Sequence, residues 1–579
     1  MFEQGICGDC KAQPKIEAKQ LGGNRATLFV YATEGLENMA FIANAISLVT
    51  YFYGYMNFSL TKSSTTLTNF MGTAFLLTLV GGFISDTYLS RFKTCVIFAS
   101  IELIGYVLLT VQAHLPDLRP FPCKNVSPDQ RNQLCENAST GQLAILYGGI
   151  YLIALGTSGV KAALPALGAD QFDEKDPKEA SQLSSFFNWF MFSLTIGAMF
   201  GVTFVVWIST NKGWDWAFGV CTIAVLFAAV FVCMGKSLYR HNIPKGSPLL
   251  RFLQVFVAAY RNRKLAIPDN AGELHEIQSD KEAALHNEII QRTEQFRFLD
   301  RAAVAIRSDD ASSTIPQGPW RLCTVTQVEE TKILIRMLPI IFSTVFMNTC
   351  MAQLQTFSIQ QSTTMDTDLF GFKIPSASIP IIPLLFMFIL IPIYDKILVP
   401  IARKITGIPT GIRHLQRIAV GLVLSAVSMA VAGVVETWRK SVAFQHNMVD
   451  STEPLPISVF WLGLQYAIFG AADMFSVVGL LEFFYEESSD GMKSLSTAIS
   501  WCSIAFGYFL SSVVVEVVNK VSGGWLASNN LNRDKLNYFY WLLSVLSVLN
   551  LGIYVMCASW YKYKKVEVKE DDLSKDTKA

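Results

Sequence analysis

Two acidic residues lie close together inside a long apolar stretch near the start of the chain. Glu34 and Glu37 fall within 26–56, which is long enough to cross a bilayer as a helix. At about 3.6 residues per turn, they lie one turn apart on the same helix face. A carboxylate at the centre of a membrane helix costs roughly 2.5–3.5 kcal/mol and usually has a functional reason. The spacing predicts a proton- or substrate-handling site that faces a cavity, or a structural ion pair inside a helical bundle.

The composition indicates what must position these acids. Apolar residues make up 51% of the 579 residues and charged residues 16%, whereas about a quarter are charged in soluble domains. A net charge of +1 leaves no basic stripe that could bind nucleic acid. Apolar runs predict an all-α membrane protein with twelve transmembrane helices. These helices are 26–56, 65–86, 94–114, 142–169, 184–209, 215–239, 331–360, 375–400, 413–436, 456–484, 495–520 and 537–561.

The twelve spans fall into two sets of six, separated by a polar segment. The expected organisation is an N-terminal tail (1–25), six helices (26–239), a linker (240–330), six helices (331–562) and a C-terminal tail (563–579). Within the linker, 248–263 is apolar on one face and basic towards its end, which predicts a helix at the membrane interface. No phosphate loop, metal cluster or nucleophile elbow occurs, so we expect no enzymatic activity, metal site or cofactor.

Charged loops and glycosylation sequons predict the orientation. Basic residues such as Arg91, Lys93 and Arg403 fall in short loops on one side, and they predict that this side, with both termini and the linker, is cytoplasmic. The opposite side carries three candidate glycosylation sites, Asn57, Asn125 and Asn137. Cys123 and Cys135 share an outer loop there, where a disulfide is plausible.

Other charges lie inside or at the ends of predicted spans. Lys161 falls in the middle of the fourth span, where an ammonium is costly unless it forms an ion pair or binds an anionic ligand. Asp86 and Arg91 flank the tight turn between the second and third spans and can pair across it. The pair fits an ordinary helix-end contact, and it also resembles the loop signature that latches the inner gate in the major facilitator superfamily.

Several motifs spread over the chain carry a more specific resemblance. They are Phe186-Phe-Asn188-Trp-Phe with a later Gly197, Asp170-Gln-Phe-Asp173, Phe296-Arg-Phe-Leu-Asp300-Arg-Ala-Ala and Trp320-Arg-Leu-Cys. Together they resemble the plant nitrate transporter 1/peptide transporter family, a branch of the proton-coupled oligopeptide transporters. The Glu-x-x-Glu-Asn form ending at Asn38 and the pattern over 352–358 are similar to a subfamily that imports abscisic acid or gibberellins.

This resemblance implies a major facilitator fold, in which two pseudo-symmetric six-helix bundles rock around a substrate near the bilayer midplane. It implies that Glu34 and Glu37 handle protons and that Lys161 binds the acidic end of the substrate. Asp473 on the tenth span would face Lys161, although the family usually has Glu there. Asn38 stands where the family keeps a base, which implies either easier protonation of the neighbouring acids or weaker coupling.

The seventh span contains three further candidate substrate contacts. Met351 occupies the position where nitrate carriers of the family have His, and its thioether offers neither a proton nor a charge. Met351 therefore favours a ligand with apolar bulk over nitrate. Asn348 and Gln353 could hydrogen-bond a ligand, and plain helix packing is the alternative for this span. Thr94 matches a phosphosite of a relative, which implies a regulatory kinase.

The resemblance implies a proton-coupled importer of a small organic anion, such as abscisic acid or a gibberellin, that works by alternating access and is driven by a proton gradient. Its partners would be this anion, protons and membrane lipid. The alternatives are a low-affinity nitrate transporter of the same fold and a transporter-like sensor that signals through the linker. We expect the plasma membrane, with the vacuolar membrane as the alternative.

Overall fold

The computed structural model of the chain describes residues 22–58, 60–121, 136–173, 176–240, 248–268, 274–275, 290–305, 318–369, 372–373, 379–408, 410–449, 453–488, 492–526 and 531–563. The predicted Cys123–Cys135 disulfide and the sequon asparagine Asn125 lie outside these residues, as do nearly all of both predicted tails.

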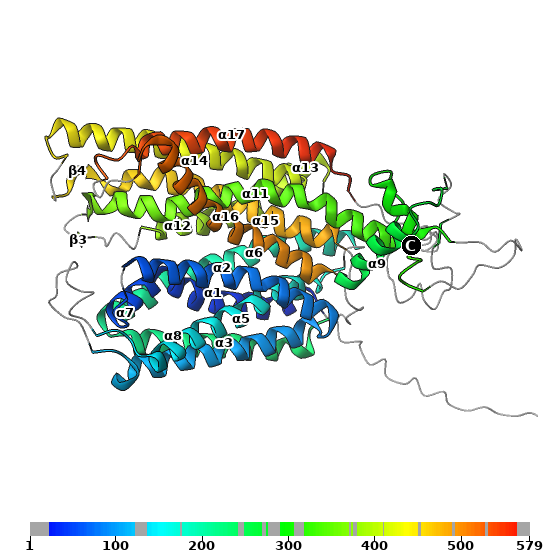
Figure 1. The fold of residues 1–579 in the computed structure, drawn as a ribbon, viewed down its shortest axis with the longest axis horizontal. Coiled ribbons are helices and arrows are strands. Elements are labelled where there is room, and N and C mark those ends of the chain that lie inside the picture. Colours follow the sequence, from blue (N-terminus) through cyan, green and yellow to red (C-terminus); the bar gives the residue numbers. More distant parts are fainter. Residues whose placement is uncertain are drawn as a thin grey trace, which may run out of the picture.

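The first half of the chain forms a bundle of six membrane-length helices (Figure 1). The fifth is continuous through a π-helical turn, because α6, η3 and α7 follow one another without a break. The six are α1 Gly23–Gly54, α2 Leu60–Thr87, α3 Arg91–His114, α5 Thr140–Ala169, α6 Pro177–Phe200 with η3 Gly201–Val205 and α7 Val206–Asn211, and α8 Trp214–Met234.

The second half repeats this pattern. Its second helix also contains a π-helical turn, η8, between α12 and α13. The six are α11 Val325–Thr363, α12 Ile381–Ile393 with η8 Tyr394–Leu398 and α13 Val399–Thr406, α14 His414–Gln445, α15 Leu462–Glu487, α16 Lys493–Ser522, and α17 Leu536–Trp560. The two bundles meet where α2 packs against α16 and α6 packs against α12. The predicted all-α fold with twelve spans is confirmed.

The polarity of α1 sets it apart from the other spans. Eleven of the twelve contain an 18-residue window apolar enough to be recognised as membrane-spanning by composition. α1 is not among them, although its 32 residues are ample for a crossing. α1 packs mainly against α6, α8 and α2, and its polar side chains are turned into the bundle; they include the buried Glu34, Glu37, Asn38 and Asn44.

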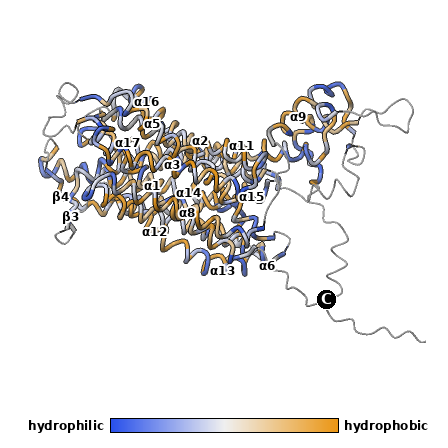
Figure 2. Tube along the Cα trace, turned by 90° about the horizontal axis from the view of Figure 1, so that it is seen from below, coloured by the Kyte–Doolittle hydropathy of each residue, from blue (hydrophilic) through white to orange (hydrophobic). Residues whose placement is uncertain are grey.

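The two ends of the bundles differ. One end, which we call the α9 end, carries the linker elements α9 Pro248–Arg261 and η6 Arg297–Ala303 (Figure 1). The opposite end carries four short strands: β1 Met365–Asp366 pairs in parallel with β4 Leu455–Ser458, and β2 Asp368–Leu369 pairs antiparallel with β3 Phe372–Lys373. Figure 2 shows that hydrophobic residues dominate the middle of the bundles, as a bilayer requires.

Candidate functional site

A buried ion pair joins α5 to α1 in the first bundle. Lys161 Nζ lies 3.0 Å from Glu37 Oε2, and both side chains are at most 3% exposed. Thr157, one turn before Lys161, donates a hydrogen bond to the other carboxylate oxygen of Glu37. Asn38 Oδ1 accepts from Lys161 Nζ at 3.4 Å, while its amide nitrogen donates to Leu194 O on α6 at 2.8 Å. Asn38 therefore links α1 to two other helices of the bundle.

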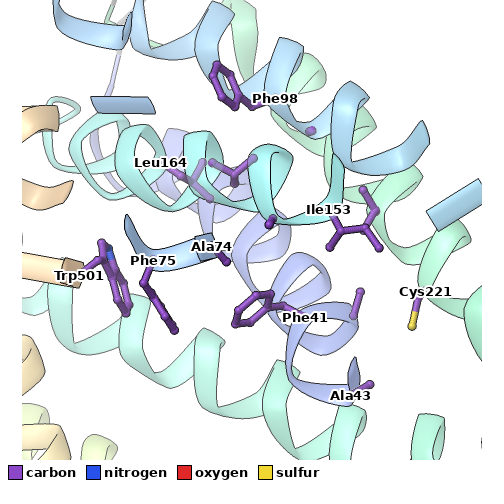
Figure 3. Close-up of a cluster of buried hydrophobic side chains, with 14 of the residues drawn as sticks. Phe41, Ala43, Ala74, Phe75, Phe98, Ile153, Leu164, Cys221 and Trp501 are labelled. Atoms are coloured by element: carbon purple, nitrogen blue, oxygen red, sulfur yellow. The ribbon is translucent and has the colours of Figure 1, made fainter. Parts of the chain in front are cut away.

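Aromatic rings surround the ammonium on the side of the second bundle. Lys161 Nζ lies 4.8 Å from the ring centroid of Phe41 and 5.8 Å from that of Trp501. Phe75 stands between these two rings; it stacks on Trp501 at 6.2 Å and meets Phe41 edge-on at 5.9 Å (Figure 3). Trp501 belongs to α16 of the second bundle, so the two bundles meet at this cation–π cluster.

Two further acids near this pair have no partner. Glu34 and Glu102 are fully buried, and neither carboxyl oxygen of either residue has a hydrogen-bond partner among the described residues. Glu102 lies where α3 crosses α5 so closely that a Cβ on Gly156 would come within 2.4 Å of the Glu102 backbone nitrogen and Cβ. From the sequence, a helix-end or inter-helix pairing role is expected for Glu102. Among the described residues no such pair forms. The only feature of the sequence that points to Glu102 as a site residue is the position of an acid in the middle of an apolar span.

The charges of this cluster do not balance. Glu34, Glu37 and Glu102 interact electrostatically with one another and with one ammonium, that of Lys161. Burying an unpaired charge is expensive. With three carboxyls and one ammonium, the cluster is electroneutral only when two carboxyls carry protons.

The predicted contacts on α11 face its neighbour α16. Asn348 donates to Ser503 Oγ at 3.0 Å, and Gln353 donates to Ser511 Oγ at 2.7 Å. Met351 is half-buried and packs against the core of the second bundle. Asn348 also lines a small cavity between α11, α15 and α16. Gln353 is thus placed in helix packing, and the substrate-binding roles of the three residues stay predictions.

Asp473 on α15 is half-buried, and among the described residues no hydrogen bond or ion pair occupies its carboxylate. The family resemblance implies that it faces Lys161. In this conformation the ion-pair partner of Lys161 is Glu37, so a permanent Lys161–Asp473 pair is absent from the described part of the chain.

The predicted gate residues meet the second bundle at the α9 end. Arg91 forms ion pairs with Asp86, at 3.6 Å, and with Asp170. Arg91 Nε also donates to Ser494 Oγ of α16 at 2.9 Å. Asp86 accepts from the backbone nitrogen of Leu495 at 2.7 Å. The two bundles are thus joined here by hydrogen bonds of buried charged groups.

A second cluster at the same end repeats this arrangement with the bundles exchanged. Arg417 of α14 pairs with Glu482 of α15 at 3.2 Å and donates to Asn188 Oδ1 of α6 at 2.6 Å. Asp395 of η8 accepts from Asn188 at 2.8 Å, and also from Ser185 and Trp189. This contact explains the Asn188-Trp189 motif. The sequence analysis did not identify Asp395. It could have been found as an acid shortly before a basic loop, as Asp86 is before Arg91.

The predicted modification sites are placed differently. Asn137 is exposed, whereas Asn57 is half-buried and its amide nitrogen donates to Phe121 O at 2.9 Å and Glu136 O at 3.1 Å. Thr94 is fully buried in α3 and donates to Ser90 O at 3.3 Å, so a kinase could reach it only after α3 separates from its neighbours. In the described ranges, no group of three or more His, Cys, Asp or Glu side chains could hold a metal ion.

Two six-helix bundles that meet around buried charges define a membrane transporter of the major facilitator type. Residues 92–531 match the POT family, and the chain belongs to this family. It is 44% identical over 560 residues to Protein NRT1/PTR FAMILY 4.6 of Arabidopsis thaliana, with 94% of each chain covered. It is 46% identical over 548 residues to Protein NRT1/PTR FAMILY 4.5 of the same plant, again with 94% of each covered. The predicted membership of the nitrate transporter 1/peptide transporter family is confirmed.

Solved transporters share the fold. The in meso crystal structure of the POT family transporter PepTSo superposes with a TM-score of 0.59 at 17% identity, over 93% of this chain and 98% of that chain. An auto-inhibited POT family peptide transporter gives 0.58 at 17% identity, over 93% of this chain and 97% of that one.

Proposed function

We propose that this transporter is a proton-coupled importer of a small organic anion, of the class of abscisic acid or a gibberellin. The observation that carries the proposal is the Lys161–Glu37 ion pair, buried at 3.0 Å with the unpartnered Glu34 one turn away. A substrate anion would bind the Lys161 ammonium and displace the Glu37 carboxylate from it.

The coupling follows from this exchange. An anion that binds Lys161 competes with the Glu37 carboxylate for the same ammonium. Leaving Glu37 buried and ionised without its partner would be expensive, so a proton on Glu37 accompanies binding. Asn38 supplies an acceptor for Lys161 and no charge, so it adds no second cation to the exchange.

The surroundings of Lys161 favour an organic anion. The rings of Phe41 and Trp501 lie within 6 Å of the ammonium and offer apolar contact area to a carbon skeleton. Met351 likewise brings no charge or proton to an inorganic ion. A low-affinity nitrate transporter is the alternative, in which Lys161 alone would attract the ion.

Transport by alternating access requires the α9 end to open. The clusters around Arg91 and Arg417 hold that end closed and would have to separate for substrate release. We infer that the α9 end faces the cytoplasm of the plasma membrane, because its short loops are basic. α1 begins and α17 ends at this end (Figure 1), so both termini would be cytoplasmic.

Radiotracer uptake in oocytes that express the chain tests the proposal. Abscisic acid, gibberellic acid, nitrate and a dipeptide are compared at two external pH values, with and without a protonophore. We expect uptake of a hormone acid that rises as external pH falls and collapses with the protonophore. Uptake that ignores both treatments would contradict proton coupling, and nitrate currents without hormone uptake would favour the alternative.

A further inference from the structure

The cavity between α11, α15 and α16 has a composition of its own. Its empty space of about 320 Å³ includes space open to solvent, and the room inside it suits a small polar group rather than a whole ligand. Among the described residues, no charged side chain lines it. Its walls combine apolar residues such as Met347 and Leu480 with hydroxyl and amide groups on all three helices. Such a wall suits a neutral part of a ligand, in contrast to the charged cluster around Lys161.

Trp501 connects this cavity to the charged cluster. It lines the cavity, and its ring also lies 5.8 Å from Lys161 Nζ and stacks on Phe75. A ligand in the cavity would therefore be adjacent to the ammonium. The stack on Phe75, a residue of the first bundle, fixes the indole where the two bundles meet (Figure 3).

The indole N–H of Trp501 lacks an acceptor. The residue is 6% exposed, and its Nε1 has no hydrogen-bond partner among the described residues. Because an indole can only donate, nothing but an acceptor atom can satisfy it. Buried indole groups usually have such a partner, so this N–H is an unfilled position for a ligand oxygen.

Three of the four serine and threonine hydroxyls that line the cavity are committed as donors, whereas Ser476 Oγ has no hydrogen-bond partner among the described residues. Ser500 donates to Thr497 O at 2.6 Å, Ser503 to Ser500 O at 2.8 Å, and Thr344 to Ile341 O at 2.8 Å. Their oxygens keep lone pairs that a ligand hydroxyl could use. The cavity thus offers the indole N–H and the Ser476 hydroxyl as donors and several oxygens as acceptors, a pattern that fits a ligand hydroxyl or carbonyl group.

We propose that Trp501 and this cavity form a second subsite, which binds an uncharged hydroxyl or carbonyl oxygen of the substrate while its carboxylate lies at Lys161. The carboxylate end of this proposal rests on the proposed function. The expected substrates are therefore monocarboxylic acids that carry an uncharged hydroxyl or carbonyl oxygen on an apolar carbon skeleton. Nitrate could occupy only the Lys161 end.

Binding of two matched acids to the purified full chain in lipid nanodiscs tests the subsite. Abscisic acid carries ring hydroxyl and ketone oxygens, and ionylideneacetic acid keeps its carboxylate and carbon skeleton without them. Trp501→Phe keeps an aromatic ring and removes the N–H. We expect it to weaken abscisic acid binding about tenfold and to change binding of the analogue by less than about twofold. Trp207→Phe, a 53% exposed tryptophan on α7, should change neither.

The subsite would be overturned if Trp501→Phe changed the affinity for both acids equally or changed neither. It would also be overturned if the wild-type chain bound neither acid. Should Trp501→Phe fail to fold, the wild-type chain with ¹⁵N-labelled tryptophan decides. One indole N–H resonance should shift with abscisic acid and stay in place with the analogue, and identical spectra would overturn the subsite.

These binding measurements need no proton gradient, so the two proposals fail separately. If Trp501→Phe weakens binding of abscisic acid alone but uptake does not depend on pH, the subsite stands and proton coupling fails. If uptake is proton-coupled but Trp501→Phe affects both acids equally, proton coupling stands and the subsite fails.

Discussion

Lys161 of α5 pairs with Glu37 of α1 inside the first bundle, at 3.0 Å, whereas Asp473 on the facing bundle has no partner among the described residues. The cation that an anionic substrate needs is thus already neutralised by an acid of its own bundle. A substrate anion must displace that acid, and the displaced acid must be neutralised in turn. This exchange joins anion binding to proton binding at a single residue.

Replacing Lys161 with alanine should lower uptake of the organic anion at least about tenfold, because the ammonium attracts the carboxylate of the anion. The variant leaves Glu37 buried without a partner, which destabilises a protein by roughly 3–5 kcal/mol unless the acid is protonated. The double variant Lys161→Ala/Glu37→Gln should therefore restore surface expression and still not transport. Expression and tracer uptake are measured together. Normal uptake by either variant would remove Lys161 from the site.

Glu37→Gln should make anion binding independent of pH. The amide mimics the protonated acid, so Lys161 is open to the anion at every pH. In the wild type, binding of abscisic acid in nanodiscs should be stronger at low pH; in the variant, the neutral-pH affinity should rise to the low-pH value. The matched change Glu294→Gln, in an exposed linker residue, should keep the wild-type profile. A Glu37→Gln variant with an unchanged pH profile would contradict the exchange.

Gly156→Ala should destabilise the first bundle, because the new Cβ would come within 2.4 Å of Glu102 where α3 crosses α5. We expect a loss of about 1–3 kcal/mol, seen as a lower melting temperature of the purified chain. Gly148→Ala on the same helix meets no atom within 4 Å and provides the control. Equal melting temperatures for the two variants would show that the crossing is looser than the structure indicates.

Removing both arginines of the closed end should open it. In Arg91→Ala/Arg417→Ala, the hydrogen bonds to Ser494 and Asn188 are lost, while the contacts of Asp86 with Leu495 and of Asp395 with Asn188 remain. Labelling of a cysteine placed at Ser496 of α16, whose hydroxyl has no hydrogen-bond partner among the described residues, by a thiol reagent added on the α9 side should then increase about tenfold. Lys404→Ala, in an exposed residue of α13, is the control. Unchanged labelling would show that other contacts hold this end closed.

Met351→His should raise nitrate flux if this position on α11 tunes selectivity. The half-buried thioether packs against the second bundle and offers no charge, whereas an imidazole can carry one. Nitrate-evoked current in oocytes measures the change, with Phe342→His, at an exposed position of α11, as a position control. Currents equal to wild type would separate Met351 from ion selection.

Much of this architecture could be predicted from the sequence because it depends on length and polarity. The apolar run 26–56 predicted α1 as a membrane span despite its two acids. Those acids, Glu34 and Glu37, then indicated where the functional site lies. The linker motif Phe296-Arg-Phe-Leu-Asp300-Arg-Ala-Ala was recognisable, but its role was not. Asp300 pairs within the linker with Arg292 at 2.9 Å and, across to α11, with Lys332 at 2.5 Å.

What could not be predicted depends on which helices touch. Glu102 became a candidate only once the crossing at Gly156 placed it beside α5. Asp395 gained its meaning from Asn188, more than two hundred residues earlier. From the sequence, Lys161 was expected to face Asp473 of the tenth span and also to lie opposite the acids of the first span. Three-dimensional packing showed that Glu37, rather than Asp473, pairs with the ammonium in this conformation.

The most direct test follows protons and substrate together. The purified chain is placed in liposomes that contain a pH-sensitive dye and receive tritiated abscisic acid from an acidic exterior, with protein-free liposomes to correct for passive diffusion. The exchange at Glu37 predicts that tracer uptake by the wild type acidifies the interior beyond this background, and that Glu37→Gln loses this acidification. Protein-dependent uptake of abscisic acid without excess acidification in the wild type would contradict proton coupling.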